Sequence, residues 1–336
     1  MHIRNIGSTR THRTHRTLVG VIAGLALIVA ACGSDGDSDA SDASEAPVTT
    51  ASAGPATTAT PTGTEAPDVT TESEDVPQRV ISLSPTHTEI MFAIGAGDQL
   101  IAVDDYSNYP AEALELPHEL SGFEPNVEAI AAYEPDLVLI GGDFNGLGEQ
   151  LDSIDIASWD GPAALVVEDT YAQIEQLGAL TGHVAEAASL VASMQTEMAA
   201  IVAEAPAMDE PLTYYHELGP DLYSVDSTTF LGELYGMLGL RNIADQVEAG
   251  DSQGYPQLNA EFIVSADPDL IFLADTKCCS ESLATVGARP GWEAMSAVVN
   301  GNVIEMDDDI ASRWGPRIVD YLAEVAKAVE QAAVPA

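Results

Sequence analysis

The sequence predicts an α/β fold made of two similar lobes that are separated by a long helical segment. Two stretches, residues 126–140 and 259–273, repeat the same order of Asn, Glu, Pro-Asp and an apolar run, with six of fifteen positions identical. Between these copies, apolar residues recur at helical spacing from about residue 169 to 205. The repeat therefore indicates a duplicated α/β lobe, and the segment between the copies is a candidate rigid connector.

Each copy of the repeat predicts a short helix followed by a buried strand. The Asn side chain can cap the helix by accepting a bond from a free N–H group, and the Glu lies in the first turn, where the helix dipole favours negative charge. The Pro then stops the helix. The four or five apolar residues that follow are too few for another helix and are typical of a strand buried on both faces of a parallel sheet.

Length and charge limit the classes of function. The chain has 336 residues, which suffices for two lobes and further segments. Its 54 acidic residues against 11 basic ones give a formal net charge of −43. This balance argues against nucleic acid and anionic lipid as partners, since both attract basic surfaces. Acidity of this kind is typical of a solvated surface in a salt-tolerant organism.

The first 31 residues have the pattern of an export signal, with basic residues, a short apolar run from Leu18 to Ala30 and small residues before Cys32. The ending Val29-Ala30-Ala31-Cys32 resembles a bacterial lipobox, which implies that Cys32 carries a lipid. An ordinary secretory signal with a chance Cys is the alternative. Residues 32–78 are mostly small, acidic or Pro residues and predict a disordered tether with a reach of about 35–40 Å. We therefore expect a domain that is held at the extracytoplasmic face of the cell membrane by its lipid alone.

In the N-terminal lobe, expected over residues 79–168, strands alternate with helices and polar loops follow the strands. Because the carboxyl ends of parallel strands meet at one edge of a sheet, these loops are candidates for a binding site. The expected strands are 79–83, 100–103 and 137–140, and the loops that leave them are 84–89, 104–110 and 141–146. Another helix and strand are expected between the last of these loops and about Glu168.

The connector is expected over residues 169–206, as one long helix or as two helices with a break at Gly182. The C-terminal lobe, residues 207–336, repeats the order of the first lobe. Its expected strands are 212–216, 242–244, 270–273 and 303–306, and its expected helices include 229–240, 292–299 and a last one from Pro316.

Several motifs resemble one family of binding proteins over about residues 79–330. They are Val-Ile-Ser-Leu-Ser-Pro-Thr-His-Thr-Glu (80–89), Tyr-Ser-Asn-Tyr-Pro (106–110), Asn-Val-Glu-Ala-Ile (126–130), Glu-Pro-Asp-Leu-Val (134–138) and Ser-Arg-Trp-Gly-Pro-Arg-Ile (312–318). They are similar to the substrate-binding proteins of iron–siderophore and cobalamin ABC importers. The resemblance implies two Rossmann-like lobes joined by one long helix, with the ligand in the cleft between them.

The resemblance also implies a role for the repeated Glu. In this family one exposed Glu on each lobe pairs with Arg residues of the membrane permease, and by motif position these are Glu128 and Glu261. The alternative is a purely local role, in which each carboxylate stabilises its own helix N-terminus by a few tenths of a kcal/mol.

For the ligand, the resemblance to the cobalamin-binding member rests on Tyr106, Asp309 and Arg313. Aromatic side chains that could stack on a flat macrocycle are Tyr106, Phe123, Phe144, Tyr255 and Trp314. Arg313 and Arg317 could bind an oxygen-rich anion such as a ferric siderophore, or could form ion pairs with an acidic side chain. We therefore expect a monomeric receptor that delivers cobalamin or a related corrinoid to an ABC permease. A ferric-siderophore or haem receptor is the alternative, and a surface sensor or adhesin is a weaker one.

Metal and enzyme functions find little support in the sequence. His87 and His216 each follow the first strand of a lobe and could reach a metal chelate, but a single His in such a loop is usually structural. No cofactor and no catalysis are expected, because the sequence has no phosphate loop with Lys and no Gly-x-Ser-x-Gly elbow. Cys278 and Cys279 could form a disulfide or remain thiols; their Cα atoms, ~3.8 Å apart, would strain a bridge.

Overall fold

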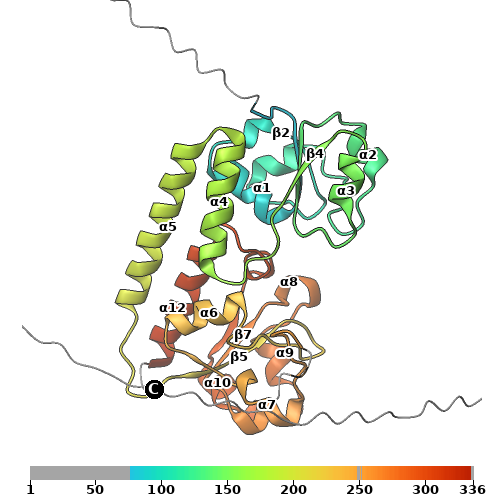
Figure 1. Ribbon diagram of the computed structural model, residues 1–336. Coiled ribbons are helices and arrows are strands. Elements are labelled where there is room, and N and C mark those ends of the chain that lie inside the picture. Colours follow the sequence, from blue (N-terminus) through green and yellow to red (C-terminus); the bar gives the residue numbers. More distant parts are fainter. Residues whose placement is uncertain (1–75, 248–249, 251, 334–336) are drawn as a thin grey trace, which may run out of the picture. The chain divides into compact units, whose positions relative to one another are not determined.

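The strands of the described chain form two four-stranded sheets in which every strand pair is parallel (Figure 1). This computed structural model describes residues 76–247, 250 and 252–333, which all belong to one unit. The N-terminal lobe has the order β2-β1-β3-β4, and the C-terminal lobe has the matching order β6-β5-β7-β8. Their bounds are β1 (Val80–Leu83), β2 (Leu100–Val103), β3 (Leu137–Ile140), β4 (Ala157–Asp160), β5 (Thr213–Glu217), β6 (Arg241–Asn242), β7 (Leu270–Leu273) and β8 (Val303–Glu305).

The repeated apolar runs form central strands. All residues of β1, β3 and β7 are buried, as expected for strands covered on both faces. In the N-terminal lobe the α-helices are α1 (Pro85–Ala93), α2 (Val127–Ala131) and α3 (Leu147–Asp152). In the C-terminal lobe they are α6 (Phe230–Met237), α7 (Ala260–Ala266), α8 (Thr276–Cys279), α9 (Leu283–Gly287), α10 (Ser296–Asn300), α11 (Asp308–Ala311) and α12 (Ile318–Ala333).

The two copies of the repeat fold in the same way. The side chain of Asn126 accepts a hydrogen bond from the N–H of Ala129, and Asn259 caps α7 in the same manner. The Asp of each Pro-Asp pair also has one role in both lobes. Asp136 accepts bonds from backbone N–H groups just before β1, and Asp269 accepts them from Thr213 at the start of β5. Each copy therefore fastens its third strand to the start of the first strand of its sheet.

The connector consists of two helices, α4 (Val167–Thr181) and α5 (Val184–Glu204). A single helix across 169–206 is therefore wrong, and the alternative with a break at Gly182 is confirmed. Gly182 has a φ of 79°, a left-handed conformation that ends α4 and that residues with a Cβ rarely adopt. The two helices lie side by side, and α5 makes the long passage between the lobes (Figure 1).

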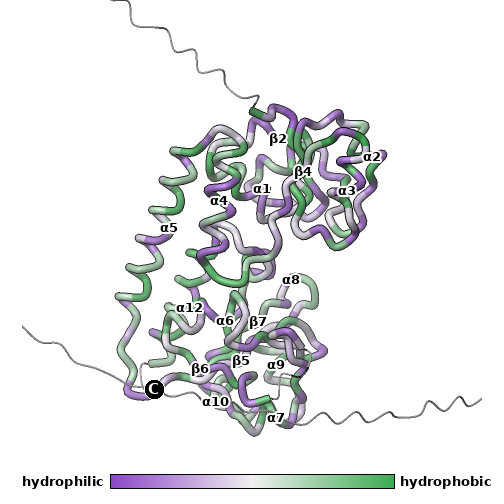
Figure 2. The backbone as a smooth tube through the Cα atoms, viewed as in Figure 1, coloured by the Kyte–Doolittle hydropathy of each residue, from purple (hydrophilic) through white to green (hydrophobic). Residues whose placement is uncertain are grey.

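Hydrophobic and hydrophilic residues alternate along α5 (Figure 2), and its buried residues recur at helical spacing, as in Ala187, Val191, Met194 and Met198. Across the described residues, no helix combines the length and the apolar character that a membrane crossing requires. The expected signal peptide, Cys32 as the expected lipidation site and nearly all of the expected tether lie outside the described residues.

Candidate ligand-binding site

A cavity of about 620 Å³ lies at the carboxyl ends of the N-terminal sheet. The loops that leave β1, β2 and β3 supply most of its wall, and residues 309 and 312–314 add a wall from the C-terminal lobe. Parallel sheets bind ligands at this edge because successive loops converge there. Gly122 lets another loop approach closely, since a Cβ at this position would lie 2.5 Å from the carbonyl oxygen of Leu83. The cavity is therefore built between the lobes, with the N-terminal lobe supplying most of it.

Three aromatic side chains at this cavity are left open to solvent. The exposed fractions are 55% for Tyr106, 73% for Phe123 and 88% for Phe144, and all three line the cavity. The rings of Tyr106 and Phe123 meet edge to face, with 5.5 Å between their centroids. Exposed aromatic surface at a concave site is typical of a region that a ligand covers. The structure thus brings together three of the five aromatic residues singled out from the sequence on this exposed surface.

The other two aromatic candidates have different surroundings. Trp314 lines the cavity and is held from behind, because its indole N–H donates to Gln173 Oε1 at 2.9 Å and its carbonyl accepts from the Thr170 hydroxyl. Tyr255 is about half exposed and is not part of the cavity wall. The sequence could not separate these cases, because it does not show which loops converge in space.

Arg313 and Arg317 form a buried ion-pair cluster with Glu89 of α1. Arg313 Nη1 lies 2.7 Å from Glu89 Oε1, and Arg317 Nε donates to Glu89 Oε2 at 2.9 Å. Arg313 Nη2 also donates to the carbonyl of Tyr106. Both guanidinium groups form ion pairs with Glu89, which favours the ion-pair alternative over the expected anion-binding role, although Arg313 also lines the cavity. Glu89 thus joins the two lobes. The sequence did not single it out, although two of the few Arg residues in an acidic chain could have been expected to pair with a buried carboxylate.

Asp309 forms the second polar link between the lobes. Lys277 Nζ lies 2.7 Å from Asp309 Oδ2 and 2.7 Å from Asp307 Oδ1, and Asn108 of the N-terminal lobe donates to Asp309 at 3.1 Å. Burial acts to raise the pKa of Asp309, but the bonds from Lys277 and Asn108 and the charge of Arg313 outweigh it, so the pKa lies below its usual value. Asp309 therefore stays ionised at the cavity wall.

A further carboxyl group, Asp104, lines the cavity from the end of β2. Burial raises its pKa to about 6, although the Ser107 hydroxyl donates a hydrogen bond to it. A carboxyl group in this state can accept hydrogen bonds from a ligand at neutral pH and can donate one when it is protonated. Sequence reasoning missed it because acidic residues are common in this chain.

His87 and His216 are both fully buried and lie outside the cavity wall. His87 Nε2 lies 3.1 Å from Gln173 Oε1, and His216 Nδ1 lies 2.8 Å from the hydroxyl of Tyr235. Burial lowers the pKa of His87 to about 4 and that of His216 to about 3. The idea that either ring reaches a metal chelate in the cleft is therefore wrong. Within the described ranges, no three His, Cys, Asp or Glu side chains are grouped as a metal site.

Glu128 and Glu261 lie in the first turns of α2 and α7, and both are exposed. Among the described residues neither takes part in an ion pair. Each lobe therefore presents one free carboxylate at an equivalent place in its fold.

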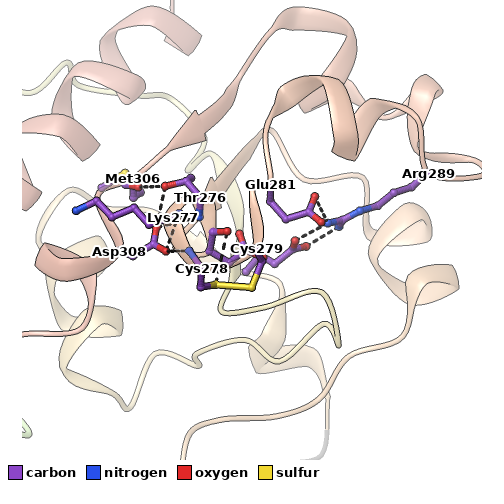
Figure 3. Close-up of a disulfide and its surroundings, with 10 residues drawn as sticks. Thr276, Lys277, Cys278, Cys279, Glu281, Arg289, Met306 and Asp308 are labelled. Atoms are coloured by element: carbon purple, nitrogen blue, oxygen red, sulfur yellow. Dashed lines mark hydrogen bonds and ion pairs between the residues drawn. A yellow bond between two sulfur atoms is a disulfide. The ribbon is translucent and has the colours of Figure 1, made fainter. Parts of the chain in front are cut away.

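Cys278 and Cys279 form a disulfide at the end of α8 (Figure 3). Nearby, the Glu217 carboxylate at the end of β5 forms a pair of 2.6 Å bonds with Arg289, which also contacts Glu281. Asp275 is fully buried beside this cluster, and neither of its carboxylate oxygens has a hydrogen-bond partner among the described residues. Burial and the charge of Glu217 raise the pKa of Asp275 to about 7.

The chain is similar in sequence to known proteins. The periplasmic binding protein family model matches residues 80–310. YvrC of Bacillus subtilis, an uncharacterized ABC transporter substrate-binding lipoprotein, is 30% identical over 272 residues, which are 78% of this chain and 82% of that protein. A cobalamin-binding protein of Halobacterium salinarum is 32% identical over 268 residues, 77% of this chain and 71% of that protein.

Among solved structures, the periplasmic heme-binding protein RhuT of Roseiflexus has a TM-score of 0.67 and 23% identity, over 76% of this chain and 99% of that chain. This likeness concerns the fold. The match of the family model over residues 80–310 and the similarity to the Bacillus subtilis relative show that the chain belongs to the periplasmic binding protein family, among the substrate-binding proteins of ABC transporters.

Proposed function

We propose that the protein binds cobalamin or a related corrinoid at the cavity and delivers it to an ABC permease. The observation that carries the proposal is the combination of exposed aromatic rings with carboxylates, and no uncommitted guanidinium group, among the described residues of the wall. Tyr106, Phe123 and Phe144 offer ring faces and edges to a flat ligand. The cobalamin-binding relative of Halobacterium salinarum supports the same ligand.

The charge of the wall distinguishes among the ligands of this family. Its acidic and basic residues are Asp104, Asp143, Asp309 and Arg313, and the guanidinium of Arg313 is paired with Glu89. A haem with two propionates or an anionic ferric siderophore would therefore meet net negative charge without a free cation in the described wall. A corrinoid carries many carboxamide groups, which can donate hydrogen bonds to the carboxylates of Asp104 and Asp309.

Delivery would use the two exposed carboxylates of the repeats. Glu128 and Glu261 present one free anion from each lobe, which suits a permease with a cationic group in each of two similar subunits. Anchoring through a lipid on Cys32 would keep the receptor beside that permease. The lipoprotein name of the Bacillus subtilis relative supports the anchor.

Ligand choice is tested by calorimetric titration of the full chain carrying Cys32→Ser, which removes the lipid site. Cyanocobalamin should bind with a submicromolar Kd, whereas haem and an anionic ferric catecholate siderophore should bind at least about tenfold more weakly, because an unpaired buried charge costs more than about 1.4 kcal/mol. Tighter binding of haem or the siderophore than of cyanocobalamin would refute the corrinoid assignment and favour that ligand instead.

Docking is tested separately by uptake of labelled cyanocobalamin into cells. The variant Glu128→Ala/Glu261→Ala should keep the ligand affinity and lose uptake. The matched control is Glu175→Ala/Glu330→Ala, which removes one exposed Glu from α4 and one from α12 and should leave uptake intact. Equal uptake by both variants would exclude the docking role.

A further inference from the structure

The loop that holds the disulfide occupies the same place in its lobe as the Phe144 loop does in the other. In the N-terminal sheet Leu83 is paired with Ile140, and the loop after Ile140 lines the cavity. In the C-terminal sheet Glu217 is paired with Leu273, and the loop after Leu273 leads directly into α8. The carboxyl edge of β7 therefore carries the Cys278–Cys279 disulfide where its counterpart carries a cavity-lining aromatic side chain.

Direct contacts connect the disulfide with Asp308 (Figure 3), and the next residue, Asp309, belongs to the cavity wall. Asp308 accepts hydrogen bonds from the backbone N–H groups of Thr276, Lys277 and Cys278 at 2.9–3.0 Å. The next residue, Asp309, lines the cavity and is bonded by the side chain of Lys277. The conformation of α8 thus sets the position of the lysine that neutralises Asp309.

The helix α8 is too short to be stable by itself. It contains four residues, fewer than an isolated helix needs, because the first turn costs more conformational entropy than one hydrogen bond returns. Its order depends on the Asp308 bonds at one end and on the covalent ring at the other. Both cysteines are exposed, so an external thiol can reach the bridge.

We propose that Cys278–Cys279 is a thiol–disulfide exchange site, and that its reduction by a dithiol mobilises α8 and weakens ligand binding at the cavity. In the first step a thiolate of the dithiol attacks one sulfur, and the other cysteine leaves as a thiolate that takes up a proton. In the second step the remaining thiol of the reagent closes its own disulfide and releases the first cysteine. Two electrons and two protons pass from the dithiol to the protein.

Reduction changes the cavity through Lys277. The Cys278 sulfur lies 3.7 Å from the Asp275 carbonyl oxygen, so a thiol formed there has an acceptor within the same turn. The other thiol has lost its covalent restraint on the last residue of α8. As α8 loosens, Lys277 spends less time beside Asp309, and the wall becomes more negative and less ordered. The effect on affinity should match the loss of one partly exposed ion pair, about two- to fivefold in Kd.

The site itself is tested without any ligand. The full chain with Cys32→Ser is treated with dithiothreitol, freed of reagent under anaerobic conditions and examined by thiol titration and hydrogen–deuterium exchange. We expect two new thiols per chain and faster exchange over residues 276–279 and 308–313, with no change in β1 and β3. Absence of the thiols in the folded chain, or unchanged exchange over those two segments, would overturn the proposal.

The effect on binding rests on the proposed function and uses cyanocobalamin as the probe. The reduced chain and the variant Cys278→Ser/Cys279→Ser should both bind it about two- to fivefold more weakly than the oxidised chain, and the variant should not respond to dithiothreitol. Equal affinity in the oxidised and reduced chains would refute the link to the cavity. If cyanocobalamin binds to neither form, the proposed ligand fails, while the exchange measurement still decides whether the disulfide controls α8 and its neighbours.

Discussion

The two lobes share one sheet topology but use its carboxyl edge differently. Both have four parallel strands in the same order, and both fasten the third strand with the Asp of a Pro-Asp pair. At the N-terminal edge the loops leave a cavity with exposed aromatic side chains. At the C-terminal edge the loops are closed by the Glu217–Arg289 pair and by a disulfide. The duplicated frame therefore fixes where a site can be built, and the loops decide whether it is left open.

Removing the Glu89 carboxylate, which joins the two lobes, should have the largest effect on the free energy of unfolding. Glu89→Ala leaves the buried Arg313 with only the longer 3.3 Å contact to Asp309 among the described carboxylates, and deprives Arg317 of Glu89 as well. We expect the free energy of unfolding to fall by about 3–5 kcal/mol, measured by urea denaturation. The control Glu330→Ala, at an exposed position on α12, should stay within about 0.5 kcal/mol of the parent chain. A similar small change in Glu89→Ala would show that the cluster contributes little.

A pH series compares the buried carboxyl groups of the two lobes. The raised pKa of Asp275, about 7, lies above the value of about 3.9 in an unfolded chain. The folded state therefore holds a proton that the unfolded state has lost between these values, and stability falls as the pH rises through this window. Asp275→Asn removes this loss, and at pH 8 it should be about 1–3 kcal/mol more stable than the parent chain.

The counterpart in the N-terminal lobe is Asp104, with a pKa raised to about 6. For Asp104→Asn the stability difference should reach its plateau about one pH unit lower than for Asp275→Asn. Near pH 4 the carboxyl group is protonated in the folded state and about half protonated in the unfolded state, so the stability of both variants should lie close to that of the parent chain. Thermal unfolding from pH 4 to 8 measures both curves, and a difference that shrinks with rising pH would contradict the sign.

Aromatic residues from the two lobes should differ in their effect on the ligand. Phe144 is 88% exposed in the cavity wall, so Phe144→Ala should weaken cyanocobalamin binding about five- to tenfold, which is about 1 kcal/mol, with little change in stability. Tyr255 lies outside that wall, and Tyr255→Ala should change the Kd less than about twofold. Calorimetric titration measures the Kd of both variants. A larger loss of affinity in Tyr255→Ala than in Phe144→Ala would show that the C-terminal lobe supplies the main ring contacts.

The smallest expected effect on the free energy of unfolding is at two equivalent positions, one in each lobe. Glu128→Ala and Glu261→Ala each remove a carboxylate from the first turn of a short helix, and each should lower the free energy of unfolding by about 0.3–1 kcal/mol. Because the surroundings are alike, the two values should agree within error in urea denaturation. A much larger loss at one position would reveal a contact that its counterpart lacks.

The fold could be predicted because the repeat carries its own local signals. Asn126 and Asn259 cap their helices, and the apolar runs after the Pro-Asp pairs form central strands, as their patterns predicted. The site was predicted less completely. Whether Arg313 meets a ligand or Glu89 depends on packing between residues more than 200 positions apart, which no local pattern encodes. The same holds for Tyr255, whose place relative to the cavity depends on how distant loops converge.

The buried cluster around Glu89 also bears on how the chain can be divided. Cut between the lobes, the N-terminal part would hold a desolvated carboxylate, and the C-terminal part would hold two guanidinium groups that have lost their shared partner. Each half would then be poorer in stability than its own hydrophobic core suggests. Two lobes that arose as copies of one unit have in this way become interdependent, and neither half is a self-sufficient module.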